Sequence, residues 1–143
     1  MTVIIDAKDM LLGRLASIVA KRALAGEEII IINAEKAVIS GTYESLVETY
    51  THKRERGDIY KGPFFPRMPD RLVRRTIRGM LPWHKAKGRA AFKKVKVYIG
   101  KPVEIEKIKA ATLDLKKEAA SSRLKDQKFV RVEEISRALG AHW

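Results

Sequence analysis

The sequence predicts an α/β fold that begins with a parallel strand–helix–strand unit. Two apolar runs of strand length, Val3–Asp6 and Glu28–Asn33, flank an amphipathic segment of helix length, and a later strand-like run lies at Val95–Ile99. Two strands joined by a helix pair in parallel, because the helix returns the chain to the same end of the sheet. With 143 residues, of which 45% are hydrophobic, the chain can bury a core, and we expect residues 1–143 to form a single domain.

The opening unit is defined by its hydrophobic pattern. Glu28–Asn33 contains four consecutive isoleucines, as expected for a strand buried on both faces. Between Leu11 and Leu24 apolar residues recur at helical spacing. We expect Asp9 to cap this helix through its carboxylate and Gly26 to end it.

Further elements are expected along the rest of the chain. We expect a short edge element at Val38–Gly41 and a helix at Tyr43–Arg54. An extended loop should follow at Gly57–Pro69, and then a second helix at Asp70–Leu81 that is capped by Asp70. A basic loop, a helical turn and a strand follow at Pro82–Gly88, Arg89–Lys94 and Val95–Ile99. A weakly periodic helical stretch is expected from Lys101, then an extended segment at Phe129–Val132 and a helix at Glu133–Leu139.

Positive charge is concentrated in the middle of the chain. The sequence has 30 lysines and arginines against 17 acidic residues, a net charge of +13, and residues 52–101 alone contain sixteen basic and three acidic side chains. Residues 1–51 and 102–143 are nearly neutral. Because so large an excess repels itself in a compact state, it indicates a polyanionic partner, first of all the phosphates of a nucleic acid. We expect residues 102–143 to be peripheral to this block.

The segment Asp70–Leu81 predicts a helix with two distinct sides. At about 100° per residue, one arc holds Arg71, Arg74, Arg75 and Arg78, and the opposite side holds Leu72, Val73, Thr76, Ile77 and Met80. A guanidinium binds phosphate through paired hydrogen bonds and stacks on bases. A phosphate contact is therefore favoured over a solvated face, and over a membrane-surface helix, which would need bulkier apolar residues.

Basic loops on both sides of this helix extend the predicted surface. Aromatic side chains among cations can stack on unpaired bases, although Phe64 and Phe65 are equally suited to anchoring a loop to the core. Trp83 and His84 are expected to be more exposed. The predicted RNA-binding residues are Lys53, Arg54, Arg56, Lys61, Arg67, Arg71, Arg74, Arg75, Arg78, Trp83, His84, Lys85, Lys87, Arg89, Lys93 and Lys94.

Several motifs in order along the chain resemble the universal large-subunit ribosomal protein thirteen family. The main motif has three pieces, Ile77–Pro82, Gly88–Arg89 and Val95–Gly100, which are separated by two spacers of five residues each. Leu12–Ala16, Asn33–Glu35 and Ser40–Gly41 resemble the family as well, so that the likeness covers about residues 3–100. Pro66–Arg75 and Lys128–Gly140 resemble its archaeal and eukaryotic branch, and the absence of a long eukaryotic extension favours the archaeal type. Residues 101–127 match poorly.

This resemblance implies a fold and a role. The fold would be a three-layer α/β/α domain around a small, mainly parallel sheet that carries the basic helix and loops. The role would be that of a structural constituent of the large ribosomal subunit in the cytoplasm, with residues 52–101 as its RNA-binding block. It would bind large-subunit ribosomal RNA, stabilise its tertiary fold and assembly, and contact neighbouring ribosomal proteins. Neither a cofactor, a membrane nor a small-molecule substrate is expected.

Two other classes of function fit the sequence less well. An RNA-modifying enzyme would also be basic and α/β, but the loop at Asp6–Gly13 has no glycine-rich phosphate cradle and no nucleophile motif is present. His52, His84 and His142 lack metal-ligand spacing, so no metal site is expected. A DNA-binding role has no helix-turn-helix signature, and basic residues spread over a helix and loops suit an irregular RNA surface better.

Overall fold

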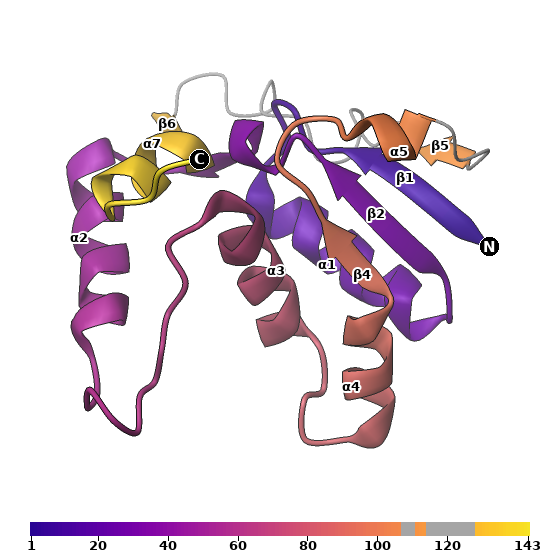
Figure 1. Ribbon diagram of the computed structural model, residues 1–143, viewed down its shortest axis with the longest axis horizontal. Coiled ribbons are helices and arrows are strands. Elements are labelled where there is room, and N and C mark those ends of the chain that lie inside the picture. Colours follow the sequence, from indigo (N-terminus) through magenta and orange to yellow (C-terminus); the bar gives the residue numbers. More distant parts are fainter. Residues whose placement is uncertain (107–110, 114–127) are drawn as a thin grey trace.

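A four-stranded parallel sheet forms the centre of the molecule (Figure 1). The computed structural model describes residues 1–106, 111–113 and 128–143. The strands lie in the order β4-β2-β1-β5, with bounds Val95–Val97, Glu28–Ile32, Thr2–Asp6 and Ala111–Leu113. All three pairings are parallel, with Val3 opposite Ile29 and Ile29 opposite Val95. The predicted α/β class and parallel sheet are confirmed, and β5 is a strand that sequence reasoning missed.

Three helices cover one face of this sheet. They are α1 (Leu12–Leu24), α3 (Pro69–Met80) and α4 (Ala86–Lys93). α1 packs against both α3 and α4, and α3 also packs against β4. The main core forms where alternate strand residues such as Ile5 and Ile31 meet Leu15 and Val19 of α1 and Ile77 of α3. α3, the predicted basic helix, is therefore fixed to the sheet by its apolar side.

The other face of the sheet holds a smaller apolar cluster. Ile4, Ile30 and Ile32 pack there with Ile105 of the single-turn helix α5 (Val103–Glu106), and Tyr98 lies at its margin. Successive strand residues point to opposite faces, so both layers need apolar side chains from β2. This accounts for the four consecutive isoleucines, and α5 supplies the second helical layer of the predicted α/β/α arrangement.

A second, two-stranded sheet connects the C-terminal segment to the basic helix. β3 (Val38–Ser40) pairs antiparallel with β6 (Phe129–Arg131), and α7 (Val132–Ala138) follows directly. α7 packs against α2 (Tyr43–Glu55), α3 and the 3₁₀ turn η1 (Ala34–Lys36). The buried hydroxyl of Ser136 donates a hydrogen bond to the Arg67 carbonyl. In Figure 1, α2 stands on the side of α3 away from the sheet, and α7 bridges the two.

Both predicted aspartate caps are wrong. The residue before α1 is Leu11, and Asp9 lies in a left-handed turn (φ 57°) with its Oδ1 3.4 Å from Nη2 of Arg131. In α3, Met68 precedes the helix and Pro69 takes its first turn, which leaves Asp70 inside the helix with a buried Oδ1 that has no hydrogen-bond partner. Proline fits the first turn because its missing N–H would have no helical partner there.

The remaining elements agree with expectation except at their ends. α4 begins at Ala86, earlier than the predicted turn, because Gly88 lies inside the helix instead of ending the loop. The helical stretch expected from Lys101 falls mainly outside the described residues. Within the ranges that the structure describes, no helix is long and apolar enough to cross a bilayer.

Candidate nucleic-acid interface

The predicted binding residues are all at least partly open to solvent. Arg74, Arg75, Arg78 and Trp83 are half-buried. The other predicted residues are exposed, namely Lys53, Arg54, Arg56, Lys61, Arg67, Arg71, His84, Lys85, Lys87, Arg89, Lys93 and Lys94. Between described residues, ion pairs join only side chains outside this set. The positive charge of this surface is therefore left without acidic partners inside the described part of the molecule.

The helix α3 has the two sides that the sequence predicted. Leu72, Val73 and Ile77 are buried, whereas Arg71 is exposed. Met80, expected on the apolar side, is 44% exposed because the helix ends there and its last turn extends beyond the core. Arg78 lies in this last turn, where a cation interacts favourably with the helix dipole.

Two of the α3 arginines belong to a stacked cluster with two aromatic rings. The guanidinium of Arg78 lies 4.1 Å from the ring centroid of Trp83, and that of Arg74 lies 4.4 Å from the ring centroid of Phe92 in α4. The two rings meet edge to face, with centroids 5.3 Å apart. One face of Trp83 is thus covered by Arg78. Each stacked guanidinium is held by its face, so its N–H groups lie at its edge, although the Nε of Arg74 is buried and has no hydrogen-bond partner among the described residues.

The proline and glycine motif after α3 shapes the turn that carries Trp83. Gly88 lies so close to Pro82 that an added Cβ would be 2.1 Å from the Pro82 carbonyl oxygen. The same oxygen accepts the Lys85 N–H at 3.0 Å, which begins α4. The spacing between Pro82 and Gly88 therefore sets the position of Trp83 beside Arg78. Phe92, which holds Arg74, was missed as a site residue, since its partner is eighteen positions earlier and no local pattern links them.

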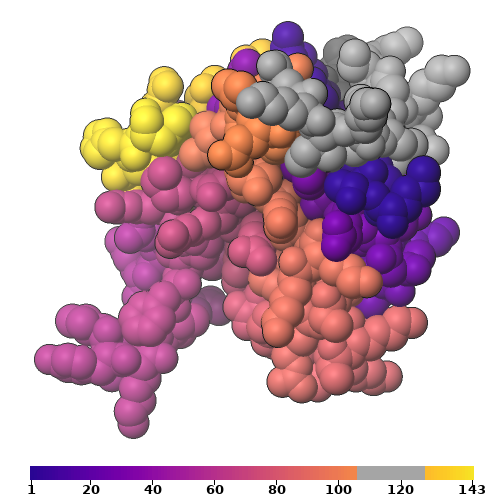
Figure 2. Space-filling view, turned by 45° about the vertical axis from the view of Figure 1, so that its right-hand side comes forward, coloured from indigo at the N-terminus to yellow at the C-terminus, as the bar shows by residue number. Residues whose placement is uncertain are grey.

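The segment after α2 projects from the body of the molecule. Figure 2 shows it in magenta at the lower left, with the outline hollowed between it and the salmon-coloured α4. A small hairpin closes at its tip, where the Asp58 and Gly62 backbones exchange N–H···O bonds of 3.2 and 3.0 Å. Ile59 and Tyr60 are 86% and 88% exposed at this tip. Gly57, with a φ of 101°, has no room for a side chain, because a Cβ would lie 2.4 Å from the Gly62 carbonyl oxygen.

A pocket of about 400 Å³ lies between α2, this segment and α3, and we term it the α2–α3 pocket. Its lining residues are Tyr50, Lys53, Arg56, Pro63, Phe65, Arg75, Thr76 and Gly79. The Tyr50 and Phe65 rings pack at 5.9 Å, and the Lys53 ammonium lies 4.7 Å from the first ring centroid and 5.7 Å from the second. Burial raises the pKa of the Tyr50 phenol, because the interior disfavours the phenolate.

The two phenylalanines of the projecting segment have different environments. Phe65 is half-buried against the core and anchors the segment, with the Arg75 guanidinium 6.0 Å from its ring centroid. Phe64 is 73% exposed, so of the two only Phe65 has the anchoring role that the sequence left open. The structure thus brings Lys53 and Arg56 from the end of α2 together with Arg75 of α3 around the Tyr50 and Phe65 rings.

Some predicted residues lie apart from this arrangement. Arg54 donates to the Leu139 carbonyl at 3.0 Å, and Lys94 donates to the Gly26 carbonyl at 3.0 Å, so both hold neighbouring segments together. Lys93 and Lys94 line a separate hollow beside Thr2 at the edge of the sheet.

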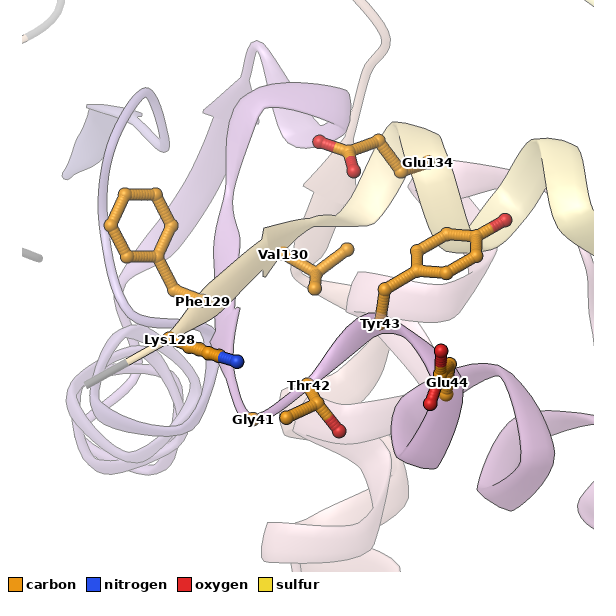
Figure 3. Close-up of a pocket in the computed structure, with 8 residues that line it drawn as sticks. All are labelled: Gly41, Thr42, Tyr43, Glu44, Lys128, Phe129, Val130 and Glu134. Carbon is orange, nitrogen blue, oxygen red and sulfur yellow. The ribbon is translucent and has the colours of Figure 1, made fainter.

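Another pocket, drawn in Figure 3, lies beside β3 and β6. Two acidic side chains, Glu44 and Glu134, line it with Lys128, and Phe129 and Tyr43 stand on either side of Val130 in this view. Its mixed charge sets it apart from the basic surface. Across the described ranges no group of three or more histidine and acidic side chains is placed to hold a metal ion.

Comparison with known proteins identifies close relatives over nearly the whole chain. The sequence profile of the family described as Ribosomal protein L13 matches residues 1–104. The chain is 49% identical over 142 residues to the "Large ribosomal subunit protein uL13" of Methanocaldococcus jannaschii, covering 96% of this chain and 97% of that protein. The protein of the same description from Methanosarcina barkeri is 46% identical, covering 96% of this chain and 97% of that protein. The one from Natronomonas pharaonis is 45% identical, covering 98% of this chain and 92% of that protein.

Proposed function

The chain belongs to the ribosomal protein L13 family, and we propose that its basic surface binds large-subunit ribosomal RNA and stabilises the tertiary fold of that RNA. Proteins of this family are structural components of the large ribosomal subunit and not enzymes, so the chain has a structural role in a particle of RNA and other proteins. The relatives named above are archaeal, in agreement with the archaeal type that the sequence favoured. We place it in the cytoplasm with the ribosome.

The observation that carries the proposal is the set of unpaired arginines on α3. Arg71, Arg74, Arg75 and Arg78 share one side of a helix whose other side is fixed to the sheet, and none forms an ion pair with a described residue. Repulsion among them is relieved when phosphates approach. Because their backbone is held by the core, binding requires little reorganisation, and this favours affinity.

Within the stacked cluster, we assign the two rings a positioning role. Trp83 and Phe92 hold Arg78 and Arg74 by their faces, which restricts the orientations of both guanidinium groups before RNA arrives. The sequence suggested Trp83 as a base-stacking platform. Its half-buried ring, already covered by Arg78, suits orientation of that arginine better.

Removal of two positive charges from α3 tests the proposal. We expect Arg71→Gln combined with Arg78→Gln to weaken binding of the full chain to a large-subunit ribosomal RNA transcript. Loss of two phosphate contacts should reduce the magnitude of the log–log salt slope by about 1.4–1.8. Affinity would be measured by filter binding between about 50 and 200 mM salt, a range over which such contacts change affinity strongly.

The matched control removes the same charge elsewhere. Arg14→Gln with Lys21→Gln changes two exposed cations of α1, and we expect it to keep the wild-type slope. Equal slopes for the two double variants would contradict the assignment of α3 as the contact. A DNA-binding role would instead be supported if wild-type protein bound duplex DNA of equal length at least as tightly as the RNA.

A further inference from the structure

We infer that the α2–α3 pocket takes a single unpaired nucleotide of the bound RNA, with its phosphate among Lys53, Arg56 and Arg75 and its base against Phe65 and the space over Gly79. This inference rests on the proposed RNA binding and adds to it a place for one base. The remaining basic side chains of the surface would contact the RNA backbone only.

The lining of the pocket matches both halves of a nucleotide. Three of its side chains are cations and none is acidic, which suits a phosphate. Phe65 is half-buried and can offer a ring face to a base, and the buried Tyr50 ring packs against it at 60° and supports it. Lys53 is exposed on a long, flexible stem, so its ammonium can leave the ring faces and reach the phosphate.

The pocket is large enough for a single nucleotide but not for an RNA double helix. About 400 Å³ is within the range of roughly 300–1,000 Å³ that holds small molecules, and is far too small for a double helix. Proteins that read RNA mostly do so at loops, bulges and ends, where bases are free to leave the stack. A nucleotide in this pocket would therefore be one that is unpaired in the folded RNA.

Gly79 gives the argument independent support. It lies inside α3 without a positive φ, and a Cβ built on it meets no heavy atom within 4 Å. A glycine in a helix costs stability relative to alanine, and nothing within the described protein requires one here. Gly88 is the contrasting case, because Pro82 excludes a side chain there. Gly13 is equally open, but only Gly79 lines the α2–α3 pocket, where the lack of a side chain lets a ligand approach the helix backbone.

The test fills the pocket without altering any charge. Gly79→Leu projects a side chain into the pocket, and Gly79→Ala is a milder form whose small side chain has open space. Gly13→Leu is the matched control, since Gly13 is also an exposed helical glycine with nothing within 4 Å of a built Cβ. The probe is the full large-subunit ribosomal RNA transcript, with binding followed at several salt concentrations.

We expect Gly79→Leu to weaken binding roughly fivefold to a hundredfold, the equivalent of one stacked base, with Gly79→Ala between it and wild type. The magnitude of the salt slope should fall by no more than about 0.7, the contribution of the one displaced phosphate, and Gly13→Leu should bind normally. Chemical probing of the RNA should find a nucleotide that is reactive alone, protected by wild type, and reactive again with Gly79→Leu.

Three results would overturn the inference. Wild-type affinity of Gly79→Leu for the RNA would show the pocket to be empty in the complex. Loss of protection only at base-paired positions would show that it meets a helix. Normal RNA binding combined with poor retention in large subunits would assign it to a neighbouring protein instead. If wild type itself showed no salt-dependent RNA binding, the proposed function would fail first, and that outcome is distinct from the other three.

Discussion

Gly88→Ala should destabilise the protein because it pushes α4 away from the turn that precedes it. The added Cβ would lie 2.1 Å from the oxygen and 2.5 Å from the carbon of the Pro82 carbonyl. Carbon atoms in contact prefer about 3.5–4.0 Å, so α4 or the Pro82 backbone must move by about 1 Å or more. That backbone cannot move alone, because the Pro82 oxygen accepts the Lys85 N–H that begins α4.

The expected loss of stability is about 2 kcal/mol. Overpacking of this kind costs about 1–3 kcal/mol, and a weakened hydrogen bond adds about 1 kcal/mol. Replacement of glycine by alanine in a helix returns about 1 kcal/mol. For a chain of this size, the net change corresponds to a fall in Tm of roughly 4–8 °C. Urea unfolding and scanning calorimetry of the free protein would measure both quantities.

Gly79→Ala is the matched comparison for Gly88→Ala. Both substitutions put alanine into a helix, but only Gly88 meets the backbone of another segment. Gly79→Ala should therefore raise the free energy of unfolding by up to about 1 kcal/mol, opposite in sign to Gly88→Ala. If both substitutions stabilised the protein, the close approach of Pro82 to α4 would not constrain the fold and would not determine the position of Trp83.

Two further predictions concern the aromatic rings. Trp83→Ala should weaken RNA binding about twofold to fivefold, because it removes the Arg78 stack, which is worth about 0.5–1 kcal/mol. Trp83→Phe keeps a ring and should recover part of the lost affinity. Equal affinities for the two variants would contradict the positioning role. Tyr50→Phe should flatten the decline of stability in alkaline solution. Burial raises the pKa of Tyr50 in the folded state, so its contribution is complete below the unfolded value of about 10 and is lost as the pH rises through the folded value. Urea unfolding from neutral pH to above 10 should show wild type losing more stability than the variant, and parallel curves would exclude burial of this phenol.

The central sheet could be predicted because its signals are local and strong. The isoleucines of β2 and the helical spacing of α1 allowed one interpretation, and the structure adopted it. Helix starts were predicted less well, since Asp9 and Asp70 are both plausible caps by residue type. At Asp70 a proline one position earlier already occupied the first turn, and at Asp9 the chain turns before the helix begins.

The candidate site was predictable in composition but not in arrangement. A charge count identifies the basic block, and a helical wheel separates Arg71 from Leu72. Neither can show that Arg74 stacks on Phe92, or that Lys53 and Arg75 approach the same ring, because these partners are brought together by tertiary packing. β5 was missed for a related reason, since a three-residue edge strand carries too little pattern to be distinguished from a loop.

The pairing of β3 with β6 has a consequence for the timing of folding during synthesis. β6 begins 28 positions and α7 31 positions after residue 101, where the basic block ends, yet α7 packs on both α2 and α3, and Ser136 binds the backbone at Arg67. A nascent chain that has exposed only its first hundred residues contains every predicted RNA-binding residue but lacks the packing of α7 on α2 and α3. Contacts so distant in sequence form late, because their loop must be closed before they contribute. The surface can therefore reach its final geometry only after α7 has emerged from the ribosome that makes it.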